Sequence, residues 1–241
     1  MIKKEPLGNG IEIYVSEKHR FGTDAILLAN FADPKRSDTV CDLGTGCGII
    51  PFLWYRRREH IAVTGVEIQP DACLLAERSA EENGLSENFS VICSDLQDLK
   101  GKVPFGSFRL VTCNPPYKAD GAGIRSKSVA DKIARHEISC SLDDIIGVAA
   151  KLLQTSGRLC MCNRPERVTD MVCSMRDYGI EPKRMRIVCQ RVGAEPWLVL
   201  LEGRRCGKPG LRIMPPLYIQ EGENFSQEMI EIYGSYKEGH M

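Results

Sequence analysis

Short apolar runs rich in β-branched residues alternate with longer amphipathic stretches along most of the chain. The apolar runs predict strands at residues 39–43, 62–68, 89–93, 109–114, 157–163, 184–191 and 196–202. The amphipathic stretches predict helices at residues 24–31, 49–58, 70–83, 142–153 and 165–178. Because strands and helices alternate, we expect a parallel sheet with helices on both faces. The last two strands have no helix between them, so we expect an antiparallel hairpin that turns near Gly193.

The length and charge of the chain limit its class more than its partners. A chain of 241 residues fits one domain with a full core, residues 1–241. Lys+Arg and Asp+Glu number 32 each, so the net charge favours no particular partner. No apolar run approaches the ~20 residues of a membrane span, and no signal peptide is recognisable after Met1. We therefore expect a cytoplasmic protein without membrane contact, with a monomer favoured.

The eleven cysteines lie mostly inside apolar runs and form no C-x-x-C pair. Free cysteine behaves as a small buried hydrophobe. The pattern therefore predicts neither a metal site nor a disulfide framework, and it fits a reducing cytoplasm.

A glycine-rich loop joins the first predicted strand to a helix, with Gly44, Gly46 and Gly48 at alternate positions. Glycine allows a tight turn and a close approach to a ligand, and such loops lie where doubly wound sheets bind ligands. The spacing is G-x-G-x-G, which differs from the G-x-G-x-x-G of dinucleotide-binding proteins. Asp42 before the loop would repel a pyrophosphate but suits a cation, such as the ammonium or sulfonium of S-adenosylmethionine.

Acidic residues also end the next two strands. Glu67, followed by Ile68, stands where an acidic side chain accepts hydrogen bonds from ribose hydroxyls. Asp95, followed by Leu96, is placed to bind the amino group of adenine. Asp98 is close enough in sequence to compete for that role.

The fourth predicted strand ends in the sequence Asn114, Pro115, Pro116 and Tyr117. Prolines have a fixed φ and no N–H, so the loop is rigid and its carbonyls can accept hydrogen bonds from a ligand. Tyr117 offers a flat face for a planar substrate. The nitrogen of an aryl amine or amide is a weak nucleophile, and acceptors at Asn114 and the Pro115 carbonyl would favour its attack on a methyl group. The motif indicates methyl transfer to such a nitrogen without a strong base.

These motifs, in this order, resemble the class I S-adenosylmethionine methyltransferases with an N-P-P-Y motif. More narrowly, the chain resembles the bacterial family of tRNA (valine) adenine-37 N6-methyltransferases. The narrower resemblance depends on the leader at residues 21–28, the Arg135-His136-Glu137 segment, and the tail segments at residues 214–218 and 232–234.

The resemblance implies a Rossmann-like, seven-stranded, mostly parallel sheet with an antiparallel C-terminal hairpin. It divides the chain into a cofactor-covering segment at 1–37, a catalytic core at 38–203 and an extension at 204–241. The implied cofactor is S-adenosylmethionine, and the implied partner is tRNA. The cofactor-binding residues that it implies are Phe21, Thr23, Asp24, Asp42, Gly44, Thr45, Gly46, Gly48, Glu67, Ile68, Asp95, Leu96 and Asn114.

A basic surface for RNA is expected near the crevice. Residues 181–212 carry eight positive and three negative charges, and basic groups engage phosphates without reading sequence. The expected substrate-binding residues are Tyr117, Lys118, Arg125, Lys127, Arg135, His136, Arg204 and Arg205.

Other functions remain open from the residues alone. The same motif serves N5-glutamine methyltransferases of release factors, although only about 40 residues precede the glycine loop here, where those enzymes carry a helical domain. Adenine N6-methylation of rRNA or DNA is a second alternative. An RNA-binding module that kept the fold is a third.

Overall fold

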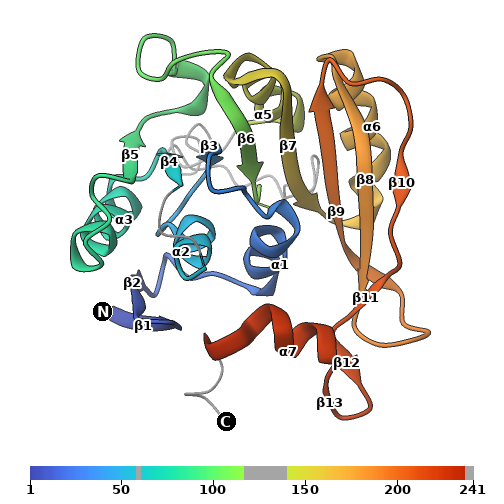
Figure 1. The fold of residues 1–241 in the computed structure, drawn as a ribbon, viewed down its shortest axis with the longest axis horizontal. Helices are drawn as coiled ribbons and strands as arrows, with labels where there is room; N and C mark the ends of the chain where they lie inside the picture. Colours follow the sequence, from blue (N-terminus) through green and yellow to red (C-terminus); the bar gives the residue numbers. More distant parts are fainter. Residues whose placement is uncertain (58–60, 117–139, 237–241) are drawn as a thin grey trace, which may run out of the picture.

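The computed structural model describes residues 1–57, 61–116 and 140–236 (Figure 1). A twisted central sheet runs through the molecule in the order β5-β4-β3-β6-β7-β9-β8. Its strands are β3 (Thr39–Leu43), β4 (Ala62–Glu67), β5 (Phe89–Cys93), β6 (Phe108–Cys113), β7 (Leu153–Asn163), β8 (Ile180–Cys189) and β9 (Pro196–Arg205). The strands β5, β4, β3, β6 and β7 are parallel to one another, whereas β9 is antiparallel to both β7 and β8. The predicted mostly parallel sheet and its antiparallel hairpin are confirmed.

The sheet extends beyond β8 by strands that the sequence did not predict. Two short strands, β10 (Arg212–Ile213) and β11 (Leu217–Tyr218), pair with it in parallel. In the described part of the chain the sheet therefore has nine strands where seven were expected. The tail runs alongside β8 and covers an edge that would otherwise expose unpaired backbone groups.

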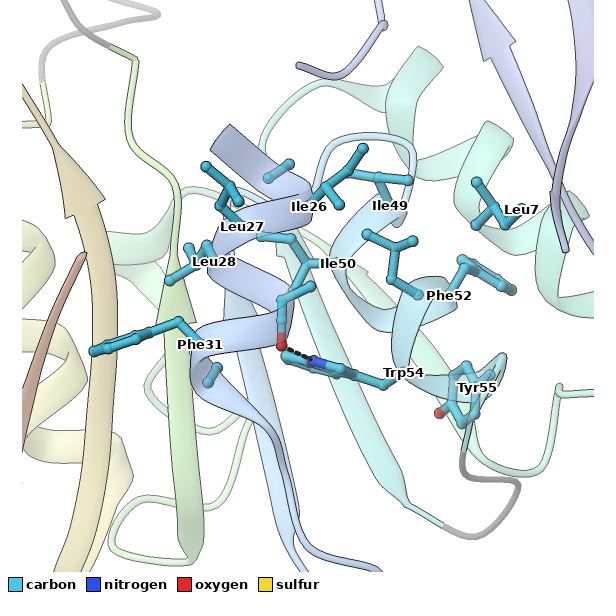
Figure 2. Close-up of a cluster of buried hydrophobic side chains, with 14 of the residues drawn as sticks. Leu7, Ile26, Leu27, Leu28, Phe31, Ile49, Ile50, Phe52, Trp54 and Tyr55 are labelled. Carbon is cyan, nitrogen blue, oxygen red and sulfur yellow. Dashed lines mark hydrogen bonds between the residues drawn. The ribbon is translucent and has the colours of Figure 1, made fainter. Parts of the chain in front are cut away.

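Helices cover both faces of the sheet, as the alternating pattern predicted. The helices α1 (Thr23–Ala32), α2 (Ile49–Tyr55) and α3 (Pro70–Glu82) share one hydrophobic cluster with one face of the sheet. The helices α5 (Leu142–Leu152) and α6 (Val168–Asp177) share a second cluster with the other face. The short helices η1 (Leu96–Asp98) and η2 (Pro165–Arg167) follow β5 and β7. Figure 2 shows the first cluster, in which the Trp54 indole of α2 donates to the Ala29 carbonyl of α1 at 2.8 Å.

Both ends of the chain form elements that the sequence pattern did not predict. At the N-terminal end is a hairpin of β1 (Ile2–Gly8) and β2 (Ile11–Ser16). At the other end are β12 (Gln220–Glu221), β13 (Asn224–Phe225), α7 (Gln227–Tyr233) and η3 (Gly234–Tyr236). The hairpin and α7 lie outside the layer of α1 and α2 (Figure 1).

The guanidinium of Arg56, just after α2, holds both ends of the chain. It is buried and donates to the carbonyls of Leu7, Ile232 and Tyr233 at 3.0, 3.1 and 2.7 Å. A buried charged donor needs such acceptors, because its desolvation would otherwise destabilise the fold. The sequence analysis gave this arginine no role.

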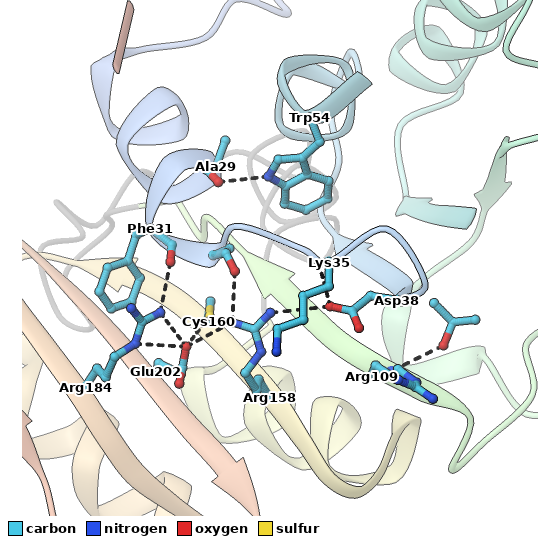
Figure 3. A network of polar contacts seen from close by, with 12 residues as sticks. Ala29, Phe31, Lys35, Asp38, Trp54, Arg109, Arg158, Cys160, Arg184 and Glu202 are labelled. Atoms are coloured by element: carbon cyan, nitrogen blue, oxygen red, sulfur yellow. Dashed lines mark hydrogen bonds and ion pairs between the residues drawn. The ribbon is translucent and has the colours of Figure 1, made fainter. Parts of the chain in front are cut away.

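A polar network fastens the C-terminal end of α1 to the sheet (Figure 3). The buried Glu202 carboxylate of β9 accepts from Arg184 at 2.6 Å and from Arg158 at 3.1 Å. The same two guanidinium groups donate to the carbonyls of Phe31 and Ala32, at 3.1 and 2.9 Å. Helix-end carbonyls need such donors. The network therefore fixes the position of α1, whose other end lies at the candidate site.

Within the described residues, no helix is long and apolar enough to cross a membrane.

Candidate active site

A row of facing residues crosses the sheet and places Asp42 beside Thr112. The register pairs Asp42 of β3 with Gly65 of β4 and with Thr112 of β6. The Thr112 hydroxyl donates to Asp42 Oδ1 at 2.6 Å. Asp42 Oδ2 is buried and makes no hydrogen bond with any residue that the structure describes. Burial raises the pKa of Asp42 to about 7, although the Thr112 hydrogen bond opposes this effect. The site therefore contains a buried oxygen that can accept a hydrogen bond from a ligand.

The glycine loop has the backbone that its spacing predicted. Gly44, Gly46 and Gly48 have φ values of 69°, 57° and 86°, in the region that favours glycine. The amides of Gly44 and Thr45 donate to the Val66 carbonyl at 2.8 and 3.0 Å, which attaches the loop to the end of β4. A Cβ added at Gly44 or Gly46 would meet no atom within 4 Å. The space above the loop is therefore open to a ligand.

The Glu67 carboxylate binds the loop from the neighbouring strand. Its Oε2 accepts from the Gly46 amide at 2.9 Å, and its Oε1 accepts from the amides of Ile68 and Gln69 at 3.0 and 2.9 Å. A carboxylate offers about four acceptor positions. The Gln69 side chain also donates to Oε1, at 3.5 Å. Glu67 therefore fixes the loop and the start of α3, and its Oε2, with one donor among the described residues, is the oxygen that can accept another.

The structure separates the two acidic candidates after β5. Asp98 lies 2.6 Å from the Lys102 ammonium in an ion pair. Asp95 is exposed and caps η1, where its Oδ1 accepts from the Gln97 amide at 2.8 Å. The half-buried Leu96 follows it. Asp95 has the more open carboxylate of the two, which favours it as the ligand contact.

Asn114, the first residue after β6, is held by side chains from two other elements. Its Nδ2 donates to Asp24 Oδ2 of α1 at 3.1 Å. Its Oδ1 accepts from the Cys162 thiol of β7 at 3.0 Å. Pro115 is buried and Pro116 is exposed. The sequence analysis placed Asp24 at the cofactor, but the structure places its carboxylate on the Asn114 amide.

Cys162 is a site residue that sequence reasoning missed, because it counted this cysteine as core. A signal was present in the strand register. Thr112 pairs with Cys160 and Cys113 with Met161, so the next pair along β6 and β7 is Asn114 with Cys162. Both side chains then point to the same face.

The leader residues contact the C-terminal segment. The Phe21 ring lies 6.2 Å from the Tyr236 ring, centroid to centroid, and Thr23 Oγ1 lies 3.3 Å from the Tyr233 hydroxyl. The C-terminal segment therefore supports the segment that we expected to cover the cofactor. The sequence carried no sign of this contact, because 210 residues separate Thr23 from Tyr233.

The structure places two of the predicted substrate-binding residues away from Asn114. Arg204 and Arg205 end β9, and Arg204 pairs with Arg158 in the middle of β7. Because β9 is antiparallel to β7, its last residues lie at the opposite edge of the sheet from Asn114; the arrowheads of the two strands point in opposite directions (Figure 1). The Arg205 guanidinium there donates to the Tyr178 carbonyl at 2.7 Å. The remaining predicted substrate-binding residues lie outside the described residues: Tyr117, Lys118, Arg125, Lys127, Arg135 and His136.

Among the described residues, no group of three or more His, Cys, Asp or Glu side chains is arranged to hold a metal ion.

Solved structures of methyltransferases share this fold. A predicted O-methyltransferase from Agrobacterium tumefaciens superposes with a TM-score of 0.72 at 21% identity, covering 88% of this chain and 96% of that one. The geranyl diphosphate C-methyltransferase of Streptomyces coelicolor, solved with S-adenosyl-L-homocysteine, superposes with a TM-score of 0.56 at 15% identity. That match covers 76% of this chain and 80% of the other.

Curated relatives align with most of the chain. One from Shewanella halifaxensis is 26% identical over 223 residues, which cover 90% of this chain and 85% of the relative. One from Porphyromonas gingivalis is 29% identical over 191 residues, covering 77% and 74%. Both relatives are named tRNA1(Val) (adenine(37)-N6)-methyltransferase.

A family match covers the site itself. The family described as the methyltransferase small domain matches residues 12–174. This range contains the glycine loop, Glu67, Asn114, and the Asp24 and Cys162 side chains that hold the Asn114 amide. The chain belongs to the methyltransferase small domain family.

Proposed function

We propose that this protein transfers a methyl group from S-adenosylmethionine to the N6 amino group of adenine 37, beside the anticodon of a tRNA. The observation that carries the proposal is the fixed Asn114 amide, which lies at the same edge of the sheet as the glycine loop. The names of the relatives support the choice of substrate.

The described residues fit S-adenosylmethionine at the glycine loop. The buried Asp42 Oδ2 lacks a partner among the described residues and suits the ammonium group of the methionine portion. Glu67 has capacity for a ribose hydroxyl, and Asp95 has an exposed carboxylate for the adenine amino group. The open space above Gly44 and Gly46 leaves room for the backbone to approach the ligand closely.

The chemistry requires the chain to activate a poor nucleophile. S-adenosylmethionine supplies a methyl group bound to a positively charged sulfur. The lone pair of adenine N6 is delocalised into the ring, so the nitrogen attacks only when its two N–H groups are held out of that plane. Asn114 Oδ1 and the Pro115 carbonyl accept these two hydrogens and stabilise the positive charge that develops on the nitrogen. Holding the nitrogen at about 3–3.5 Å from the methyl carbon removes much of the entropic barrier.

No strong base is needed in this scheme. The methylated nitrogen carries a positive charge, its proton becomes acidic, and the proton leaves to solvent after transfer. Tyr117, outside the described residues, is expected to stack on the adenine ring.

The substrate must present an unpaired base. An adenine inside a duplex would first have to be flipped out of its stack, which costs a few kcal/mol. A purine in the anticodon loop meets this requirement with less distortion. Lys118, Arg125, Lys127 and Arg135 remain the predicted contacts to RNA phosphates.

The test is methylation of defined RNA with labelled cofactor. We expect label in an unmodified valine tRNA transcript, none in the same transcript with guanine at position 37, and N6-methyladenosine on mass spectrometry of the nucleosides. Label in the guanine-37 transcript, or label found only in a release factor, would contradict the proposal.

A matched pair of variants tests the role of Asn114. Asn114→Ala should lose at least about 100-fold in turnover, as removal of a charge-stabilising hydrogen-bonding group does, while calorimetric binding of S-adenosylmethionine is kept. Asn163→Ala is the control, because Asn163 is another asparagine at a strand end, and among the described residues its side chain bonds locally, to the Arg164 amide at 2.8 Å. It should keep its turnover.

A further inference from the structure

The Asn114 amide lies between a carboxylate and a thiol, and this pair determines which way round it stands. Asp24 Oδ2 can only accept a hydrogen bond, so it takes the amino end of the amide, at 3.1 Å. The Cys162 thiol donates to the oxygen end at 3.0 Å. Reversing the amide would place its oxygen against the Asp24 carboxylate. The two contacts therefore specify one orientation of Asn114.

Gly22 leaves room for the Asp24 carboxylate, because glycine has no Cβ. A Cβ added at Gly22 would lie 2.6 Å from Asp24 Oδ1, closer than side-chain carbons approach oxygens. The φ of Gly22 is −113°, a value that any residue adopts. Backbone conformation is therefore not the reason that position 22 requires glycine. The close approach of the carboxylate does explain it.

We propose that Gly22, Asp24 and Cys162 are positioning residues that orient and polarise the Asn114 amide for methyl transfer. The inference rests on the proposed function of Asn114. The negative charge of Asp24 strengthens its hydrogen bond with the amide N–H. Linked hydrogen bonds polarise one another, so this bond increases the electron density on Asn114 Oδ1. That oxygen is the atom that accepts the substrate N–H and stabilises its developing charge.

The two positioning side chains act differently. Asp24 sets both orientation and charge. Cys162 has no exposed surface, and its thiol uses one of the two lone pairs of the carbonyl oxygen. Serine at position 162 would keep a donor, whereas alanine would remove it.

The kinetic test compares variants of the full chain by turnover number, KM for tRNA and calorimetric affinity for S-adenosylmethionine. Asp24→Asn should lower the turnover number by at least about tenfold while cofactor affinity stays within about twofold, since the charge that polarises the Asn114 amide is lost. Cys162→Ala should lower it by about fivefold, and Cys162→Ser should recover most of the loss. Gly22→Ala should resemble Asp24→Ala, and the double variant should be no worse than Asp24→Ala alone.

Matched controls are Asp71→Asn, an acidic residue in the first turn of α3, and Cys189→Ala, a buried cysteine at the end of β8. Both should keep their turnover. The proposal is overturned if Asp24→Asn weakens cofactor binding and leaves the turnover number unchanged. It is also overturned if Cys162→Ser is as slow as Cys162→Ala.

A second readout does not depend on activity. The side-chain NH2 signals of Asn114, assigned by their absence in Asn114→Asp, should move and exchange faster in Asp24→Asn. If these signals are identical in the wild-type protein and in Asp24→Asn, the positioning inference fails whatever the enzyme methylates. If the wild-type protein methylates no RNA but the signals respond as expected, the proposed substrate fails and the positioning inference stands.

Discussion

Two buried carboxylates lie on one face of the sheet and in one row of its register, yet their surroundings differ. Asp42 and Glu202 are 1% and 5% exposed. The row runs from Asp42 through Thr112 and Cys160 to Glu202. Glu202 has two guanidinium partners, from Arg158 and Arg184. Asp42 accepts from the Thr112 hydroxyl, and its second oxygen makes no hydrogen bond within 3.5 Å among the described residues, although the Thr45 hydroxyl is near enough to favour its charged form.

The electrostatic consequences are opposite. Burial by itself would raise the pKa of both groups. At Glu202 the two arginines outweigh burial, and the pKa lies below its usual value. At Asp42 burial dominates and the pKa rises to about 7. A buried carboxylate whose oxygens all have hydrogen-bond or ion-pair partners stabilises the fold. A buried carboxylate with an oxygen that lacks such a partner indicates a ligand-binding position.

The largest expected effect comes from removing the charge of Glu202, the carboxylate that is paired with two arginines. Glu202→Gln removes the anion that Arg158 and Arg184 share and leaves Arg158 only its ion pair with Asp38 at 3.5 Å among the described residues. It should lower the free energy of unfolding by about 3 kcal/mol, near the lower end for buried pairs because Arg184 is partly exposed. Urea denaturation measures the change. Glu223→Gln, at an exposed position, is the control. An unfolding midpoint equal to that of the control would refute the structural role of the network.

Removing the charge of Asp42 should weaken ligand binding but should not lower the stability of the protein. The pKa of Asp42 is raised from 3.8 to about 7 on folding, so this group favours folding at low pH and the advantage is lost as pH rises to about 7. At pH 8, Asp42→Asn should therefore unfold no more easily than the wild-type protein. Its affinity for S-adenosylmethionine should fall about 30-fold, the loss of about 2 kcal/mol for a charged hydrogen bond. If Asp42→Asn were less stable than the wild-type protein but bound S-adenosylmethionine equally well, Asp42 would be a stabilising residue like Glu202 and not a ligand-binding one.

The pH dependence of binding sharpens the same contrast. The ionised form of Asp42 is the form that attracts an ammonium group, and it accumulates as pH passes about 7. Affinity for S-adenosylhomocysteine, whose ammonium stays charged over this range, should rise about tenfold from pH 6 to pH 8. Calorimetry at each pH measures it. A flat profile in the wild-type protein, like the one expected for Asp42→Asn, would show that Asp42 does not ionise on binding.

The smallest effect tests the hydrogen bond from Thr112 to Asp42. Thr112→Val removes the hydroxyl that favours the charged form and should move the binding midpoint upward by about one pH unit, near 1 kcal/mol. Thr64→Val makes the same change on the opposite face of the sheet and should leave the midpoint in place. A midpoint that shifts equally in both variants would argue against a specific Thr112 contact.

The parts of the site that could be predicted from sequence are local. The glycine loop, Asp42 and Glu67 stand at strand ends, and parallel strands bring such ends to one edge of a sheet. The backbone requirement of Gly44 and Gly46 was likewise readable from spacing alone.

The parts that could not be predicted depend on register, strand direction or distant contacts. Cys162 meets Asn114 only because of how β6 pairs with β7. Arg204 was grouped with the site by charge, but the direction of β9 takes it to the far edge. Helix α7 has only seven residues, too few for a periodic pattern, although Ser226 caps it by accepting from the Met229 amide.

Through Arg56, the end of helix α2 depends on contacts with segments that are distant in the sequence. The Arg56 guanidinium sits between the hairpin of β1 and β2 and helix α7, and the acceptors at Ile232 and Tyr233 are synthesised 176 and 177 residues after it. A chain cut before them would leave the Arg56 cation without two of its acceptors at the end of the helix that follows the glycine loop. Loss of the contacts at one end of the chain would therefore also destabilise the other end and the glycine loop before α2.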